Sequence, residues 1–479
     1  MPEKNNKKLM DTIAIILCVF VVGFIFYDIW QTNKNLEEES SYVSETTGIL
    51  ETSEIEKIVS SEVTQIDSDD EFSTGSGNVL YPSGVTEEMT LPSFWQKKFQ
   101  DEVLMSFDQI KDFNSKEKNI FDLENVEYID PSETNVFNRQ IYLDGVEIDM
   151  DEYESIIESN KEIMHQFLYA IVVNRAPIKV WPVSENLAYT QESINDEGKI
   201  SILEVNSPFI ISEKYVAQDG KVFYYGCSEV CQGWIESTDL AICHSRQEWL
   251  DSWKIDLTAN DFIVVCQNQI IIGSPINTTL RLGTKLKIVP GNEIPYKVDN
   301  RENCLFNYYV YIPLRDEDGY FCKEIGLIPK KNKVTVGHPI FTQRNVVSVA
   351  FELLGEKFED YNSSNLIGQI YNCFGIKMPV YLTMQTKKDE YIDISNMDYL
   401  EKIDYIMKLP VGSIFYSNGM AMIYIGYIDK TPYILASTDK FSFTAVESRT
   451  ILLFSITSRS PSQRTYLEET KGILLFKKA

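Results

Sequence analysis

Residues 345–426 decide the fold class of the C-terminal part of this chain. They open with NVVSVAFELLG (345–355), where apolar residues recur every three or four positions and a glycine stands where a helix should stop. After a polar break, SSNLIGQIYNCFGIKMP (363–379) predicts a second helix, with Ser363 as its N-cap and Gly375 and Pro379 near its end. Short apolar runs typical of strands follow at 413–416, 422–425, 433–436 and 451–454. The order of these elements predicts an α+β domain.

Two helices followed by an antiparallel sheet is the order of a papain-like fold, and the detailed string resembles the NlpC/p60 family of cell-wall cysteine peptidases. The matching residues are AFxLLG (350–355), SxLI (364–367), YxCFGIxMP (371–379), Gln385, LPxGS (409–413) and GxxMIYIG (419–426). In that family the second helix begins Asp-Cys-Ser, and the helix dipole favours the thiolate of its cysteine. A histidine at the start of a facing strand is the general base, and a polar residue on the next strand orients it.

The chain departs from this pattern at each catalytic position. The Asp-Cys-Ser motif reads Asn362-Ser363-Ser364, the position of the base reads Met420, and the orienting position falls at Ala436, give or take one residue. A serine hydroxyl needs a base more than a cysteine thiol does, and methionine has no basic nitrogen. The resemblance therefore implies a catalytically inactive relative, a pseudoenzyme of a cysteine peptidase family.

Two residues offer substitutes for the lost groups. Cys373 lies ten residues after Ser363 on the same predicted helix, which is about 15 Å along the helix axis, and a buried core cysteine is the favoured interpretation. His338 precedes the domain and would have to fold back over the cleft, so a linker or surface histidine is favoured.

Length and charge limit the possible functions. The chain has 479 residues, enough for three or four domains, and its net charge of −27 argues against nucleic acid and against anionic lipid as partners. Of the eight cysteines, seven lie outside the apolar N-terminal segment, so at least one of these is unpaired in a monomer. No cofactor is indicated. A zinc site at Cys227, Cys231, Cys243 and His244 is disfavoured by the spacing, and a local disulfide and free thiols stay open.

The N-terminal region predicts an anchor and a spacer. Residues 1–30 hold lysines followed by an uncharged apolar run at 12–27, which favours an uncleaved transmembrane helix over a cleaved signal peptide. The charge distribution places the N-terminus in the cytoplasm and the bulk of the chain outside the cell membrane. Residues 31–92 are acidic and rich in Ser and Thr, which predicts a disordered stalk.

The middle of the chain predicts one helical region and two β-rich modules. In the helical region, 93–173, the clearest helix spans Asp151 to Tyr169. The first module, 174–244, resembles a bacterial SH3-type domain, and a second SH3-like module spans 260–335. In such domains aromatic residues bind peptide stems or glycans, which makes Trp181, Tyr225 and Trp234 candidate ligand-binding residues; core packing is the alternative. The papain-like domain then spans 340–456, and 457–479 is a tail.

These observations leave three functions open. The first is a membrane-anchored, extracytoplasmic protein whose SH3-type modules and inactive peptidase-like domain bind peptidoglycan or a protein partner in the cell wall. The second is an active hydrolase of peptidoglycan stem peptides, as the family resemblance alone would imply. The third is a scaffold for a wall-synthesis or division complex. The missing base favours the first.

Overall fold

The computed structural model describes most of the chain after residue 79. The described residues are 72–74, 80–132, 140–157, 161–182, 187–188, 198–217, 219–298, 301–302, 305–357, 363–386, 388, 390–417, 419–438 and 450–476. The apolar run at 12–27 lies outside them, as does most of the expected stalk. Among the described residues, no helix combines the length and the apolar character needed to cross a membrane.

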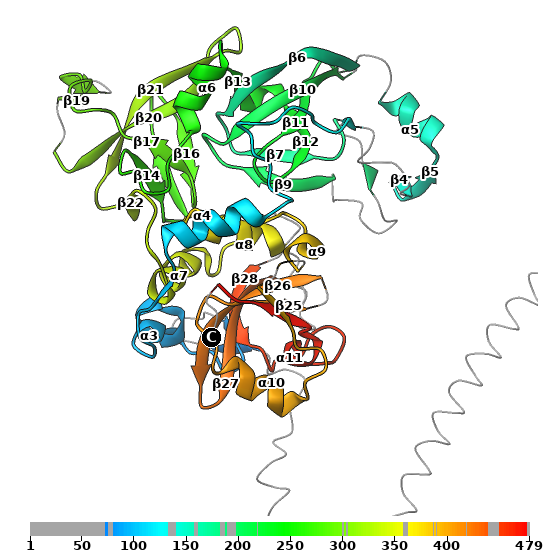
Figure 1. Ribbon diagram of the computed structural model, residues 1–479, viewed down its shortest axis with the longest axis vertical. Helices are drawn as coiled ribbons and strands as arrows, with labels where there is room; N and C mark the ends of the chain where they lie inside the picture. The colour runs from blue at the N-terminus through cyan, green and yellow to red at the C-terminus, as the bar shows by residue number, and fades with distance from the viewer. Residues whose placement is uncertain are drawn as a thin grey trace, which may run out of the picture. The chain divides into compact units, whose positions relative to one another are not determined.

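The C-terminal domain is an antiparallel sheet between helices. Its strands are β24 (Tyr391–Asp393), β25 (Ile414–Ser417), β26 (Met420–Ile428), β27 (Thr431–Thr438), β28 (Thr450–Ser455) and β29 (Gly472–Leu474), in the order β24-β29-β25-β26-β27-β28. Its helices are α7 (Gln343–Ala350), η4 (Phe351–Leu353), α8 (Ser363–Asn372), α9 (Leu382–Gln385), α10 (Tyr399–Ile406) and α11 (Tyr466–Glu469). The helix α8 packs on one face of the sheet, whereas α10 and α11 pack on the other (Figure 1). This arrangement confirms the two helices and four strands expected from 345–454.

The expected tail is part of this domain. Residues 472–474 form β29, which pairs with β24 on one side and with β25 on the other. The strand therefore completes the sheet, and the domain extends past the boundary of 456 that the sequence predicted.

The segment 80–116 also belongs to the C-terminal domain, rather than to a stalk ending at 92 or a separate helical region. It contains β2 (Leu80–Pro82), which pairs with β1 (Phe72–Thr74), then η1 (Glu87–Thr90), α3 (Pro92–Gln96), β3 (Val103–Met105) and α4 (Phe107–Lys116). Trp95 is fully buried, lies 5.4 Å from the ring of Tyr433 and donates a hydrogen bond to the carbonyl of Met89. Gly426 has a φ of +136°, and a Cβ there would lie 3.3 Å from the Trp95 ring. The tryptophan thus explains why the strand carries a glycine at this bulge.

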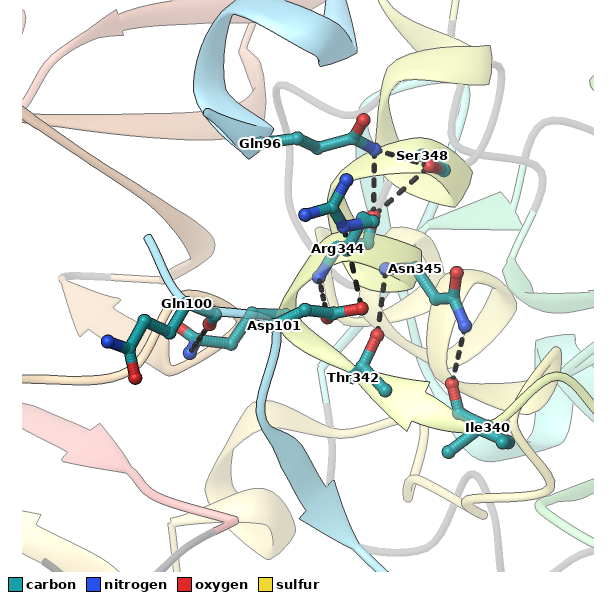
Figure 2. A network of polar contacts seen from close by, with 9 residues as sticks. Gln96, Gln100, Asp101, Ile340, Thr342, Arg344, Asn345 and Ser348 are labelled. Atoms are coloured by element: carbon teal, nitrogen blue, oxygen red, sulfur yellow. Dashed lines mark hydrogen bonds and ion pairs between the residues drawn. The ribbon is translucent and has the colours of Figure 1, made fainter. Parts of the chain in front are cut away.

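Polar contacts fix α7 to this N-terminal segment (Figure 2). Gln96 Nε2 donates to the carbonyl oxygen of Arg344 at 3.1 Å and to Oγ of Ser348 at 2.7 Å. Asp101 accepts from the backbone N–H of Arg344 at 3.2 Å. In addition, β3 pairs with β23 (Phe341–Thr342) just before α7. Residues about 240 positions apart in sequence therefore form one structural unit.

The first β-module contains a seven-stranded sheet. Its strands are β6 (Lys161–Val172), β7 (Ala176–Lys179), β9 (Lys199–Leu203), β10 (Pro208–Val216), β11 (Val222–Cys227), β12 (Gln232–Glu236) and β13 (Leu240–Ile242), in the order β13-β6-β10-β11-β12-β7-β9. A second, three-stranded sheet contains β4 (Ile141–Leu143), β5 (Val146–Ile148) and β8 (Leu187–Ala188). In sequence, β4 and β5 precede β6, and β8 lies between β7 and β9. The SH3-type nature of this module stays a prediction.

The helix expected over residues 151–169 is wrong in its second half. The helix α5 ends at Ile156 (Met150–Ile156), and the chain is extended as β6 from Lys161. There it pairs with β10 and, near its end, with β13, so Tyr169 lies opposite Ile210. Pairing between distant strands overrides the local three- and four-residue spacing of apolar side chains.

The second β-module follows α6 (Arg246–Trp253). A three-stranded sheet joins β14 (Phe262–Val265) to β17 (Lys285–Lys287) and β22 (Val334–Val336). Two hairpins complete it, β15 (Gln269–Ile272) with β16 (Thr278–Arg281) and β20 (Asn307–Arg315) with β21 (Phe321–Pro329), together with the short pair β18 (Lys297–Val298) and β19 (Arg301–Glu302). Its aliphatic core contains Ile263, Val265, Leu280, Leu286 and Ile312.

Candidate functional site

The first residue of α8 marks the candidate site. Ser363 is buried, and its Oγ accepts a hydrogen bond from the backbone N–H of Ala421 at 2.8 Å. Ala421 is the second residue of β26, so the helix start lies directly against the beginning of this strand. The neighbouring Ser364 turns away and donates its hydroxyl to the carbonyl oxygen of Val380. The hydroxyl at the helix start is thus an acceptor for a backbone amide.

The strands place different residues beside Ser363 from those that the sequence suggested. Met420 and Ala436 pack with the cluster on the α10 side of the sheet, whereas Ala421 packs with the cluster that contains α8. Side chains alternate between the two faces of a strand, so an alignment that slips by one residue moves the side chain to the opposite face. The positions of Met420 and Ala436 are corrected accordingly: their side chains do not converge with Ser363.

Ala421 and Ser437 lie on the face of the sheet that packs against α8. The register that pairs Ile423 with Leu435 continues to place Ala421 opposite Ser437, and Leu435 packs in the same cluster as α8. Ser437 is buried, and among the described residues its Oγ has no hydrogen-bond partner. The methyl side chain of alanine cannot accept a proton, and a serine hydroxyl is a very weak base at neutral pH. Strand alternation was the signal that could have identified both positions from the sequence.

No imidazole lies at this site. His165 is exposed on β6, and His244 is exposed after β13, where it stacks on Tyr320 with 4.7 Å between ring centroids. His338 is buried at the opposite end of α8, where Nδ1 hydrogen-bonds to the carbonyl oxygen of Cys373 at 2.8 Å. Burial lowers the pKa of His338 to about 4, helped by the nearby ammonium of Lys285. His338 is thus neither a surface residue nor a base for Ser363.

Cys373 does not replace the missing nucleophile. It is buried at the C-terminal side of α8, ten residues from Ser363, which corresponds to about 15 Å along the helix. Burial raises its pKa well above that of an ordinary thiol. The other described cysteines lie in the two β-modules, where four are buried free thiols and Cys322 is exposed; the buried ones are Cys227, Cys231, Cys243 and Cys266. Within the described part of the chain, no cluster of acids, histidines and cysteines has the arrangement of a metal site.

Neutral groups form the polar contacts on the α8 side of the neighbouring strand. Tyr416, which pairs with Ala421 in the sheet, donates its hydroxyl to Oε1 of Gln385 at 3.0 Å. Gln385 in turn donates to the carbonyl oxygen of Pro379 at 2.6 Å. Burial raises the pKa of Tyr416 far above its usual range, so this hydroxyl stays protonated. These two side chains can donate and accept hydrogen bonds, but neither takes up a proton at neutral pH.

The three aromatic candidates of the first β-module lie in its core. Trp181 and Tyr225 have no exposed surface, and Trp234 is 2% exposed. Tyr225 and Trp234 pack against each other at 5.2 Å between ring centroids, while Trp181 packs against Tyr153 at 6.3 Å. A ligand has no access to these rings, so the expectation that they bind glycans or peptides is corrected to a packing role.

The fold is similar to that of an NlpC/P60 endopeptidase from Photobacterium damselae subsp. piscicida. The TM-score is 0.57 at 12% sequence identity, over 80% of this chain and 95% of that chain. An NlpC/P60 family protein from Bacillus cereus ATCC 10987 gives a TM-score of 0.42 at 13% identity, over 65% of this chain and 100% of that chain. No protein-family model matches the sequence, and no curated protein matches it. The described residues therefore have the mixed α/β fold of an NlpC/P60 endopeptidase.

Proposed function

We propose that this protein binds peptidoglycan, or a protein partner in the cell wall, without cleaving it. In this proposal the apolar run at 12–27 anchors the chain in the cell membrane, with the N-terminus in the cytoplasm and the bulk of the chain outside. The two β-modules and the C-terminal domain then act as an extracytoplasmic binding unit. The similarity to an endopeptidase fold supports the link to the cell wall, since the resemblance of residues 350–426 points to the same family.

One observation carries the proposed lack of cleavage. Among the described residues, Ala421 lies against the start of α8 and Ser437 lies opposite Ala421 on the same face of the sheet, whereas the three histidines of the chain lie elsewhere. Attack on a peptide carbonyl requires that the hydroxyl of Ser363 lose its proton, and a positioned base normally takes it. Ser363 instead accepts a hydrogen bond from a backbone amide, which does not remove a proton. Among the described residues, the side chains of Ala421 and Ser437 on this face do not take up a proton at neutral pH.

Binding is tested by co-sedimentation of the full chain with purified, insoluble peptidoglycan. The proposal expects the protein in the pellet with saturable dependence on peptidoglycan concentration. Because the protein carries a net charge of −27, it should not bind anionic wall polymers, so binding to peptidoglycan should persist when these polymers are stripped. Protein that stays in the supernatant at every peptidoglycan concentration would instead favour a scaffold that contacts only other proteins.

A further inference from the structure

A cavity of about 140 Å³ lies on the side of α8 that faces the two β-modules. Leu366, Ile367 and Ile370 pack toward the sheet, whereas Asn365, Gly368, Gln369 and Asn372 line the cavity. The opposite walls come from the loop after β9, from Trp253 at the end of α6, and from Leu282–Lys285 of the second module. Ser363 does not line it, so the cavity is separate from the site described above.

Open space lies beside Gly368, at a position of α8 that could carry a side chain. It is an interior residue of α8, where glycine is less favourable than alanine because it orders a more flexible backbone. A Cβ at this position would have no atom within 4 Å, so no close approach of protein atoms requires the glycine. The space above Gly368 is part of the cavity. The helix thus keeps room for something other than its own packing.

Two buried polar atoms in the cavity wall lack partners among the described residues. Oε1 of Glu204 accepts from Arg175 at 3.1 Å and from Gln369 at 3.3 Å, but Oε2 accepts from nothing. Nε1 of Trp253 donates to nothing. A buried donor or acceptor without a partner is destabilising, and most such groups in proteins are satisfied. Glu204 and Trp253, which carry this unpartnered acceptor and donor, both line the same cavity, where a ligand or water can bind.

The charges of the wall limit the ligand. Two carboxylates, Glu204 and Glu229, and two ammonium groups, Lys285 and Lys377, line the cavity. Lys377 pairs with Glu229 at 2.6 Å, and Lys285 donates to Asn372 at 2.9 Å. Both carboxylates are therefore matched, Glu204 by Arg175 and Glu229 by Lys377. The rest of the wall combines polar side chains with aliphatic ones such as Leu282, Ile376 and Met378. A cationic ligand would lack a matching partner, whereas a neutral group with one donor and one acceptor fits the two unpartnered atoms.

We infer that this cavity is a binding site for a small neutral amide. The amide N–H would donate to Oε2 of Glu204, and its carbonyl oxygen would accept from Nε1–H of Trp253. The volume matches that of a cavity that holds a benzene-sized molecule, about 150 Å³. Two sources carry this chemistry, the acetamido group of an amino sugar and the backbone amide of a short uncharged peptide. Ser363 is not part of this binding site.

The test measures binding of two probes to the full chain by ligand-observed NMR and calorimetry. N-acetylglucosamine represents the amino sugar, with glucose as its control, and N-acetyl-alanine methylamide represents the peptide. We expect saturable binding of at least one probe, and the one that binds identifies the source. Trp253→Phe keeps a ring beside Trp249 but removes the donor, and should weaken binding about fivefold, the effect of one net hydrogen bond.

Gly368→Leu provides the blocking variant and Gly368→Ala its matched control. Both remove the glycine from the helix, but only leucine fills the space. We expect leucine to abolish probe binding and alanine to retain it, with unchanged or raised melting temperatures in both. The inference is overturned when neither probe binds saturably at millimolar concentration, which would leave water as the occupant. It is equally overturned when Gly368→Leu binds as well as the unmodified chain.

Discussion

The backbone N–H of Ala421 donates to Oγ of Ser363 at 2.8 Å, and this contact fixes the first turn of α8 against β26. The contact shows how close the strand approaches the helix start. It also shows which position on β26 would present a side chain to that oxygen, namely 421 rather than 420. The chain has an alanine there, so the pair of positions 363 and 421 carries no imidazole.

The first prediction concerns repair of that pair. Ser363→Cys combined with Ala421→His should bring an imidazole beside the new thiol, and an adjacent imidazolium lowers a thiol pKa. Ser363→Cys combined with Met420→His is the matched control, because Met420 packs on the other face of the sheet. We expect the thiol pKa, measured from the pH dependence of alkylation by iodoacetamide, to lie at least about one unit lower with Ala421→His. Equal pKa values in the two variants would contradict the assignment of the α8 face.

The second prediction concerns the role of Ser363 in the absence of catalysis. Ser363→Ala removes the acceptor for the buried N–H of Ala421, so the free energy of unfolding should fall by about 1–2 kcal/mol. Ser395→Ala, at an exposed position, serves as the control and should change stability by less than about 0.5 kcal/mol. Urea denaturation of both variants measures the difference. A neutral Ser363→Ala would show that this hydrogen bond is not formed in solution.

The third prediction concerns the aromatic core of the first β-module. Trp234→Ala should lower the free energy of unfolding by about 3–5 kcal/mol, because it empties a buried site packed against Tyr225. Binding to peptidoglycan, corrected for the folded fraction, should stay unchanged. Tyr128→Ala, at a residue 68% exposed, should leave stability within about 0.5 kcal/mol. A Trp234→Ala variant that folds normally but loses binding would restore the ligand-binding role.

The fourth prediction concerns stability between pH 4 and 6.5. Burial lowers the pKa of His338 to about 4 in the folded protein, against 6.5 as its ordinary value, so the unfolded chain binds more protons in this window. Stability should therefore fall as pH decreases from 6.5 toward 4, by up to about 3 kcal/mol from this residue. Burial raises the pKa of Asp239 to about 6, which acts in the opposite direction over part of the window.

The His338→Asn variant isolates this contribution. Asparagine can still donate to the carbonyl of Cys373 but does not titrate, so the difference in unfolding free energy between the two proteins should depend on pH only in that window. Chemical denaturation at pH 4.5, 5.5 and 7.5 measures it. Parallel pH profiles for both proteins would mean that His338 is not buried as a neutral imidazole.

Local patterns in the sequence were sufficient for much of the C-terminal domain. The two helices and the four apolar runs occur as α7, α8 and β25–β28, because helix stops and strand composition are local signals. Contacts between distant segments were not accessible in this way. The strand β29 enters the sheet between β24 and β25, and Trp95 packs on Tyr433, and neither pairing leaves a local signal.

The site was predictable to within one residue on the strands. Ser363 can be identified from the sequence because it is the first residue of α8, and the start of a helix is marked by a local N-cap signal. Met420 follows directly after Gly419, which suggests it as the position of the base. A shift of one residue along the strand places a side chain on the other face of the sheet, and Met420 lies on the α10 face. The interval allowed around Ala436 included Ser437. The cavity behind α8 was not predictable, since Glu204, Trp253 and Gly368 meet only in the folded chain.

The most direct test of the account is the release of soluble muropeptides from purified peptidoglycan by the full chain, measured by liquid chromatography and mass spectrometry. The account predicts no release above that of a sample without protein, because neither Ala421 nor Ser437 can act as a base for Ser363. Release that depends on protein concentration and disappears with Ser363→Ala would contradict it.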